Sequence, residues 1–163
     1  MTSPERKHLE KLAAPCGLYC GACSIIAAVR TGDPQLLGLI AGGVAKYLGH
    51  PVEVKDLTCE GCLSDVRAIM CRECNLRACA FEKGLTYCAQ CADFPCQQII
   101  DFNNDGFRHH SEVLDNIRRQ QEIGIEAWVK EQEERWRCPN CSCVVDWYAG
   151  QCPDCNTTLK GHF

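Results

Sequence analysis

The chain has 163 residues, of which 46% are apolar and 23% charged, with 16 cysteines and a formal net charge of −4. A chain of this length can bury an apolar core as one domain, or as one domain with a small appendage. The acidic balance argues against a general binder of polyanions. No apolar stretch reaches the roughly 20 residues that a membrane-spanning helix needs, so we expect no membrane partner.

The number of cysteines indicates either a disulfide scaffold or a thiolate metal protein. The first residues, MTSPERKHLEKLAAP, are charged and contain no apolar run of the kind found in secretory signals. Most of the cysteines form CxxC pairs, which place two thiolates on one metal ion but make poor disulfide frameworks. We therefore expect a cytoplasmic protein whose thiols are held by metal.

The N-terminal part predicts two helices after a polar lead. Residues 1–14 are expected to form a mobile lead or a short exposed helix. The run SIIAAVRT predicts a helix that ends at Gly32, and Asp33 with Pro34 predicts the start of a second helix that ends before Gly49. Apolar residues recur at helical spacing in the second helix and are expected to form the core of this domain. They are Leu36, Leu37, Ile40, Val44, Tyr47 and Leu48.

Short helical pieces are expected between the cysteines that follow. Ser64 could cap a helix over residues 65–70, LRACAFEK predicts a helix that stops at Gly84, and Pro95 could begin another. The turn sequence NNDG at 103–106 is expected to end the cysteine-rich domain.

Two further helices are predicted before the last cysteines. Ser111 is expected to cap EVLDNIRRQQEI, which Gly124 closes, and IEAWVKEQEERW forms the next helix. Its residue Trp128 should face the core, and Glu131 should pair with Arg135 on the outer face at i, i+4 spacing.

The C-terminal pairs CPNC and CPDC, separated by ten residues that include the strand-like VVDWY, are typical of a β zinc ribbon. Two CxxC turns offer zinc a closed tetrahedron with Zn–S bonds of roughly 2.3 Å, which leaves no position for a substrate. The expected site is therefore structural. Its ligands are Cys138, Cys141, Cys152 and Cys155.

Three other residues of this segment bear on the prediction. Many ribbons have glycine, which tolerates a left-handed backbone, where this chain has Ser142 and Asn156. Cys143 is a surplus thiol, interpreted as a half-buried apolar filler in preference to a ligand.

The N-terminal domain offers eleven further cysteines as metal ligands. Two triplets share the spacing CxxCxxxxC and form a repeat of 17 residues. The eleven are Cys16, Cys20, Cys23, Cys59, Cys62, Cys71, Cys74, Cys79, Cys88, Cys91 and Cys96.

The spacing does not determine which of these thiols bind the same metal ion. The two triplets could surround two zinc ions with bridging sulfurs, or Cys71, Cys74, Cys88 and Cys91 could bind one metal and leave the third cysteine of each triplet to another. Three tetrahedral sites need twelve ligands, and His109 beside His110 is a candidate for the twelfth, although such surface histidines are more often unligated. Zinc is preferred because of the CxxC pairs, and an iron–sulfur cluster is the alternative.

The stretch PCGLYCGAC has the CxxxCxxC spacing with which radical enzymes bind the cluster that cleaves S-adenosylmethionine. Those enzymes place this loop above a parallel barrel of strands. This chain has neither the length nor the alternating strand and helix pattern of such a barrel. We therefore interpret the stretch as one ligand triplet, with Cys20 and Cys23 available to join Cys59 and Cys62.

In order, PCGLYCGAC, CEGC, CRECNLRACAFEKGL and CAQCADFPC resemble the cysteine-rich domain-of-unknown-function family 3795. The resemblance covers roughly residues 14–104, and GIEAWVKEQEERWRCP often follows. It implies a small, mainly helical, metal-binding fold and brings no established activity.

The fold predicted from these observations is a small, mainly α, metal-stabilised cysteine-rich domain, a helical segment and a C-terminal β zinc ribbon. The expected divisions are a lead over 1–14, the cysteine-rich domain over 15–104, a two-helix connector over 105–135 and the ribbon over 136–163. No phosphate loop, serine triad or HExxH motif is present.

The predicted function is a multi-zinc interaction or adaptor module, and an enzyme is disfavoured. Its expected partner is a protein or nucleic acid, bound through the ribbon and the C-terminal helices. The alternative function is an iron–sulfur or thiol redox protein of the cytoplasm.

Overall fold

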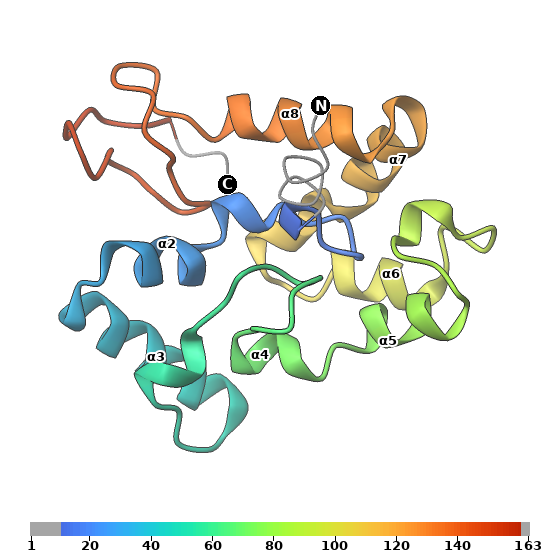
Figure 1. Ribbon diagram of the computed structural model, residues 1–163, viewed down its shortest axis with the longest axis horizontal. Coiled ribbons are helices and arrows are strands. Elements are labelled where there is room, and N and C mark those ends of the chain that lie inside the picture. Colours follow the sequence, from blue (N-terminus) through green and yellow to red (C-terminus); the bar gives the residue numbers. More distant parts are fainter. Residues whose placement is uncertain (1–10, 161–163) are drawn as a thin grey trace.

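The computed structural model describes residues 11–160, and the predicted mobility of the lead falls mostly on residues outside this range. The described part is helical, with α8 and α7 across the top of Figure 1, α2 and α3 on the left, α4 at the bottom centre, and α5 and α6 on the right. The elements in chain order are η1 (Cys20–Ala22), α2 (Ser24–Thr31), α3 (Pro34–Leu48), η2 (Val54–Leu57), α4 (Ile69–Arg72), α5 (Asn75–Glu82), η3 (Cys88–Gln90), α6 (Gln97–Asn103), η4 (Arg108–Glu112), α7 (Val113–Ile123) and α8 (Ile125–Arg135).

The boundaries of α2 and α3 follow their local sequence, as predicted. Gly32 ends α2 in the left-handed conformation, with φ +66°, which glycine adopts without a steric penalty. The Asp33 carboxylate accepts hydrogen bonds from the amides of the first turn of α3, and Pro34 occupies its first position. Gly49 then ends α3 with φ +74°.

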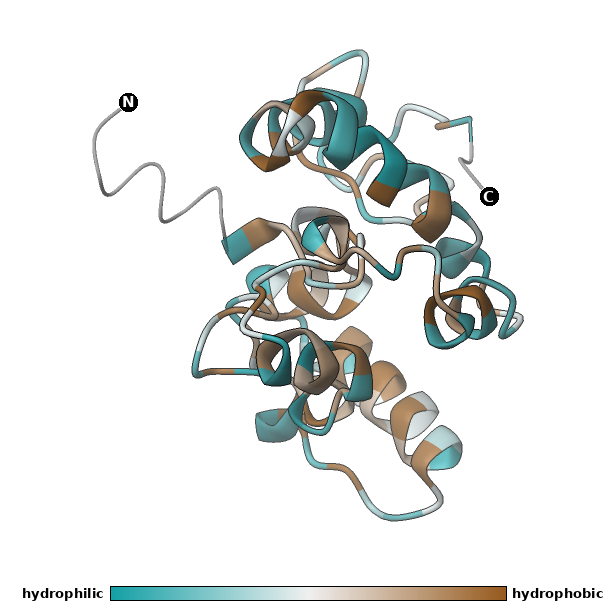
Figure 2. Ribbon diagram, turned by 90° about the vertical axis from the view of Figure 1, so that its right-hand side faces the viewer, coloured by the Kyte–Doolittle hydropathy of each residue, from teal (hydrophilic) through white to brown (hydrophobic). Residues whose placement is uncertain are grey.

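The predicted core face of α3 is correct only in part. Val44 is buried beside Ala41 and Leu57, whereas Leu36 is 38% exposed and Tyr47 is 61% exposed. The helix lies at the edge of the molecule, so only one side of it meets the rest of the fold. Figure 2 shows polar residues on the helices at the top and apolar residues along the helices at the bottom.

Two predicted helix caps are wrong. Ser64 does not begin a helix, because its hydroxyl donates to the carbonyl of Gly61 within a turn, and α4 starts only at Ile69. The Ser111 hydroxyl donates backwards to the Arg108 carbonyl, so α7 begins without a side-chain cap.

The helices α7 and α8 form a hairpin around Gly124. Trp128 and Val129 of α8 are fully buried, and Val113 with Ile117 of α7 is fully buried against the cysteine-rich region. The core therefore continues across residue 104, where the sequence predicts a domain boundary.

The predicted ion pair between Glu131 and Arg135 is wrong. Glu131 instead pairs with Arg119 of α7, with a contact of 2.5 Å, and Arg135 pairs with Glu112. Both pairs connect α8 to the segment that precedes it in the hairpin.

The predicted β ribbon is also wrong: residues 136–160 form no strand, and the part of the chain that the structure describes contains only isolated bridges. Arg137 pairs with Val144 once, and Gln151 pairs with Thr158 once. Val144 is the first residue of VVDWY, and this stretch does not continue the bridge as a strand. Further along it, the Trp147 amide donates to the Ala22 carbonyl at 2.9 Å. One backbone hydrogen bond of this stretch is thus made with the N-terminal helical region, whereas the Val145 amide donates to the Trp136 carbonyl at 3.0 Å.

No helix in the described range combines the length and apolar character needed to cross a bilayer.

Candidate metal centres

The last four predicted ligands lie on two turns with matching backbone geometry. In the first turn the Cys138 amide donates to the Cys143 carbonyl at 2.8 Å, and the Ser142 amide donates to the Cys138 carbonyl at 2.9 Å. The second turn repeats both hydrogen bonds at 2.9 and 3.0 Å. Ser142 and Asn156 have φ of +62° and +58°, which confirms the left-handed backbone at these two positions.

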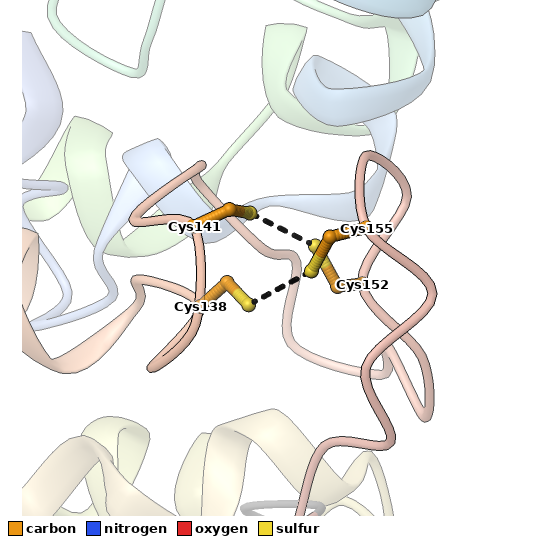
Figure 3. A group of neighbouring side chains, drawn as sticks. All are labelled: Cys138, Cys141, Cys152 and Cys155. Carbon is orange, nitrogen blue, oxygen red and sulfur yellow. Dashed lines mark hydrogen bonds between the residues drawn. The ribbon is translucent and has the colours of Figure 1, made fainter.

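The two turns bring four sulfur atoms together, as Figure 3 shows. The sulfurs of Cys138 and Cys155 are 3.6 Å apart, and those of Cys141 and Cys152 are 3.5 Å apart. All four lie within 4.8 Å of one another. A tetrahedral ion with bonds of roughly 2.3 Å requires ligand separations of about 3.8 Å, so this group has the dimensions of a mononuclear thiolate site.

Polar groups of the turns stabilise sulfur in its charged form. The Asn140 amide donates to the Cys138 sulfur at 3.4 Å, and the Thr157 hydroxyl lies 3.2 Å from the Cys155 sulfur. The hydroxyl of Thr157, aided by the side chain of Asn140, lowers the pKa of Cys155 to about 5. Thiolates are the form that binds metal, so the environment of Cys155 suits a cation. At Cys141 a backbone hydrogen bond from Cys143 lowers the pKa, but desolvation and the neighbouring thiols outweigh it and raise the pKa of Cys141 instead.

The surplus thiol Cys143 also faces this centre. Its sulfur is 3.1 Å from that of Cys152, and it lies within 4.8 Å of ligand atoms of Cys141 and Asp154. It is half-buried and packs against the core, as a filler would.

The segment that carries these turns is attached to the helical domain. The Ser24 hydroxyl, at the start of α2, donates to the Asp146 carboxylate at 2.7 Å. Trp147 stacks on the His109 ring, with centroids 4.2 Å apart and planes 15° from parallel. The four-thiol site and the helical domain are therefore joined by specific polar and aromatic contacts.

A second group of thiols surrounds a cavity between α5, η3 and α6. The cavity measures about 30 Å³ and its wall includes Cys79, Cys88, Cys91 and Cys96. Burial raises the pKa of Cys88 to about 11, and the other three thiols of the group add to the rise. Lys83 donates to the Cys91 sulfur at 3.5 Å and also pairs with Asp93.

A third group gathers thiols from the N-terminal loop and from the segment before α5. The Cys62 thiol interacts with those of Cys20 and Cys71, and its pKa is raised by the Cys20 contact and by burial. Burial raises the pKa of Cys16 as well, with a smaller effect from the neighbouring Cys74. The other two members of this region are Cys23 and Cys59, which are close enough to interact.

This arrangement splits the first triplet of the repeat. Cys79 lies with the second triplet around the cavity, whereas Cys71 forms a hydrogen bond with Cys62 and Cys74 interacts with both Cys16 and Cys88. Neither sharing scheme considered from the sequence contains this grouping. His109 contacts Trp147 and Tyr148, and its neighbour His110 contacts Asp105.

The order of thiol groups along the chain coincides with a family match. The family described as a protein of unknown function, DUF3795, matches residues 12–101, more than half of the chain. The chain belongs to the DUF3795 family. The match contains all eleven N-terminal cysteines and ends before the four-thiol site of residues 138–155, which no family match covers. No curated protein and no solved structure matches the chain.

The DUF3795 domain contains cysteine thiols that can act as metal ligands. Its buried thiols have raised pKa values because they are desolvated and lie beside one another. Bound cations would compensate the negative charge that their ionisation creates. The cysteine clusters are thus compatible with metal binding, and all sixteen cysteines are free thiols.

Sequence reasoning missed the residues that surround the thiols. Lys83 is separated from Cys91 by eight positions, and no motif signals their contact. Asp146 and Ser24 are 122 positions apart. Thr157 could have been identified, because it lies two residues after the last cysteine of a CxxC turn, where a hydroxyl can reach the sulfur.

Proposed function

We propose that this protein is a metal-stabilised interaction module in which zinc at Cys138, Cys141, Cys152 and Cys155 holds the C-terminal segment on the DUF3795 domain. The observation that carries the proposal is the set of four sulfur atoms within 4.8 Å of one another. Four thiolates complete the coordination of zinc and leave no position for a substrate, so the role of this ion is structural. Zinc supplies folding free energy to a segment that forms no sheet of its own.

A role in recognition is supported by apolar side chains at the surface. Leu39 and Tyr47 of α3 are 75% and 61% exposed, and Tyr148 of the C-terminal segment is 45% exposed. Exposed apolar and aromatic groups are typical of binding surfaces. Together with the net charge of −4, they favour a protein partner over a nucleic acid. Free thiols in this number fit the cytoplasm, which keeps them reduced.

The metal assignment is tested by zinc analysis of the protein purified without air. We expect Cys152→Ser to contain one zinc ion fewer per chain than wild type, because three thiolates bind zinc less tightly than four. Cys143→Ser is the matched control, and its zinc content should equal that of wild type. Equal zinc content in wild type and Cys152→Ser would contradict the proposal.

The recognition role is tested with a substitution on the exposed side of α3. Cross-linking through Lys46, an exposed residue of the same helix, followed by mass spectrometry, should identify a partner protein with wild type. Leu39→Asp should abolish that cross-link, whereas Val54→Asp, at an exposed residue of η2, should keep it. A cross-link that survives Leu39→Asp would show that α3 is not the binding surface.

A further inference from the structure

The thiol groups differ in how closely their sulfur atoms approach one another. At the C-terminal site all four sulfurs lie within 4.8 Å of one another, whereas among the other described cysteines no three do. Cys79, Cys88, Cys91 and Cys96 instead stand around an open space of about 30 Å³. One water molecule requires roughly 10–15 Å³ by the same measure, so the empty space between these side chains is that of about two waters.

The C-terminal sulfurs are close enough together for a single ion, whereas no three sulfurs of the cavity group lie within 4.8 Å of one another. Zinc with bonds of roughly 2.3 Å holds four sulfurs about 3.8 Å apart, which is close to the separations of 3.5 and 3.6 Å at the C-terminal site. An iron–sulfur cluster places several iron and sulfide atoms between its four thiolates, and therefore needs the thiolates to stand further apart around a cavity.

The chemistry of the cavity wall agrees with a cluster. Apart from the four cysteines, it is lined mainly by apolar side chains such as Leu76, Phe94 and Ile99, and it contains no carboxylate or imidazole. Soft thiolates select iron–sulfur clusters or zinc over hard cations. An apolar surrounding shields a cluster from solvent and helps to set its reduction potential.

The division of the first triplet provides the fourth ligand. The second triplet supplies only three thiolates, and Cys79 reaches the cavity from α5, the helix that carries Leu76 and Ala80 in the same wall. Cys71 lies with Cys62 in the other group, and Cys74 is not part of the cavity wall. A complete set of four thiolates is therefore available without any ligand from the C-terminal segment.

We propose that Cys79, Cys88, Cys91 and Cys96 bind an iron–sulfur cluster, and that the ammonium group of Lys83 adjusts its reduction potential. The Lys83 nitrogen donates to the Cys91 sulfur at 3.5 Å. A positive charge and a hydrogen bond at a ligand sulfur favour the reduced cluster, which carries one more electron. The cluster goes beyond a zinc-built interaction module, because it gives the protein a redox centre.

The test uses the full chain, purified without air and reconstituted with ferrous iron and sulfide. We expect iron and acid-labile sulfide to be present together, with visible absorbance that bleaches when dithionite transfers an electron to ferric iron of the cluster. Cys79→Ser should lose iron and sulfide in parallel, to the extent of one cluster per chain. Cys143→Ser, in the C-terminal segment, should retain both.

Two results of this experiment would overturn the proposal: a protein that contains zinc but no acid-labile sulfide, or a sulfide content that Cys79→Ser leaves unchanged. The zinc content of Cys152→Ser is a separate readout. Failure of the cluster proposal can therefore be distinguished from failure of the proposed C-terminal zinc site.

A second variant keeps the test decisive if serine at position 79 prevents folding. Lys83→Gln retains all four thiols, so iron and sulfide should remain at wild-type levels. Its midpoint potential should shift to more negative values, because the reduced cluster loses a nearby positive charge. Lys130→Gln, at an exposed residue of α8, is the matched control. A potential that is the same in both variants would refute the assigned position of the cluster.

Discussion

At the residue scale, His109 connects the helical domain to the C-terminal segment. Its ring stacks on Trp147, its Nδ1 atom forms a hydrogen bond with the Tyr148 hydroxyl, and its ring also contacts His110. The Asp105 carboxylate forms a hydrogen bond with His110. Its negative charge also opposes the lowering of the His109 pKa by burial. Burial and the neighbouring His110 thus disfavour the charged form of the His109 imidazole at this contact.

The lowered pKa of His109 predicts that the free energy of unfolding decreases in acid. Burial lowers the pKa of His109 from 6.5 to about 4, so between these pH values the unfolded chain binds a proton that the folded chain does not. The free energy of unfolding is fully retained above pH 6.5 and falls as the pH drops towards 4. We expect His109→Phe, which keeps a ring on Trp147, to lose less stability than wild type between about pH 7 and about pH 5 in urea unfolding.

Acid also releases metal from thiolates, but it does so in both proteins, and the difference between them isolates the imidazole. His50→Phe, at an exposed histidine, should have the pH dependence of wild type. If His109→Phe also has that dependence, the buried imidazole does not contribute to the acid sensitivity.

At the element scale, the loop that carries Cys16 and Cys20 is held against helices far along the chain. The Cys88 amide of η3 donates to the Pro15 carbonyl at 2.8 Å. Gly17 packs against α7, and a Cβ added at Gly17 would be 2.7 Å from a side-chain carbon of Ile117. The first thiols are thus positioned by helices that follow the DUF3795 match as well as by those within it.

This close approach makes Gly17 sensitive to substitution. Its φ of +87° is unfavourable for other residues, and a methyl group would also overlap with Ile117. We expect Gly17→Ala to lower the free energy of unfolding by about 1–3 kcal/mol beyond the cost of backbone strain. Gly106→Ala has a similar φ of +94° with no atom within 4 Å of the added Cβ, and measures that strain alone. If both variants lose the same free energy of unfolding in urea, α7 shifts to accommodate the methyl group at position 17.

The same elements show how far the sequence could predict the fold. Caps such as Asp33 and Gly32 act within a few residues, so α2 and α3 were predicted with their correct ends. The i, i+4 rule failed for Glu131 because Arg119 approaches from the other arm of the hairpin. Cysteine spacing likewise identified the C-terminal four-thiol group, but could not show that Cys79 lies with the second triplet, since that requires the packing of α5 on α6.

At the scale of the whole molecule, the C-terminal segment shares a core with the DUF3795 domain. Trp136 and Val145 of the segment pack with Tyr19, Tyr87 and Trp128 in one buried cluster. The predicted divisions at residues 104 and 136 therefore pass through shared packing. A strand-based ribbon would have had its own sheet, whereas this segment uses backbone and side-chain contacts with the helices.

Shared packing predicts that the rest of the chain depends on this segment. Removal of residues 136–163 would uncover Trp128 and Val129, both fully buried in the intact protein. The loss of packing around a buried tryptophan costs about 3–5 kcal/mol. We expect the fragment 1–135 to have a markedly lower Tm than the full chain and to bind the dye ANS, which reports exposed apolar surface.

With zinc at the C-terminal site as proposed, chelation should reproduce part of this effect in the full chain, because the segment would lose the ion that closes its two turns. Cys143→Ser before chelation should retain the wild-type Tm, since four thiolates remain. The opposite finding, a fragment 1–135 with the Tm of the full chain and no dye binding, would show that the DUF3795 domain and its two-helix extension fold independently. In that case the contacts at Asp146 and Trp147 would join two finished units, and the metal at the C-terminal site would stabilise only the segment that binds it.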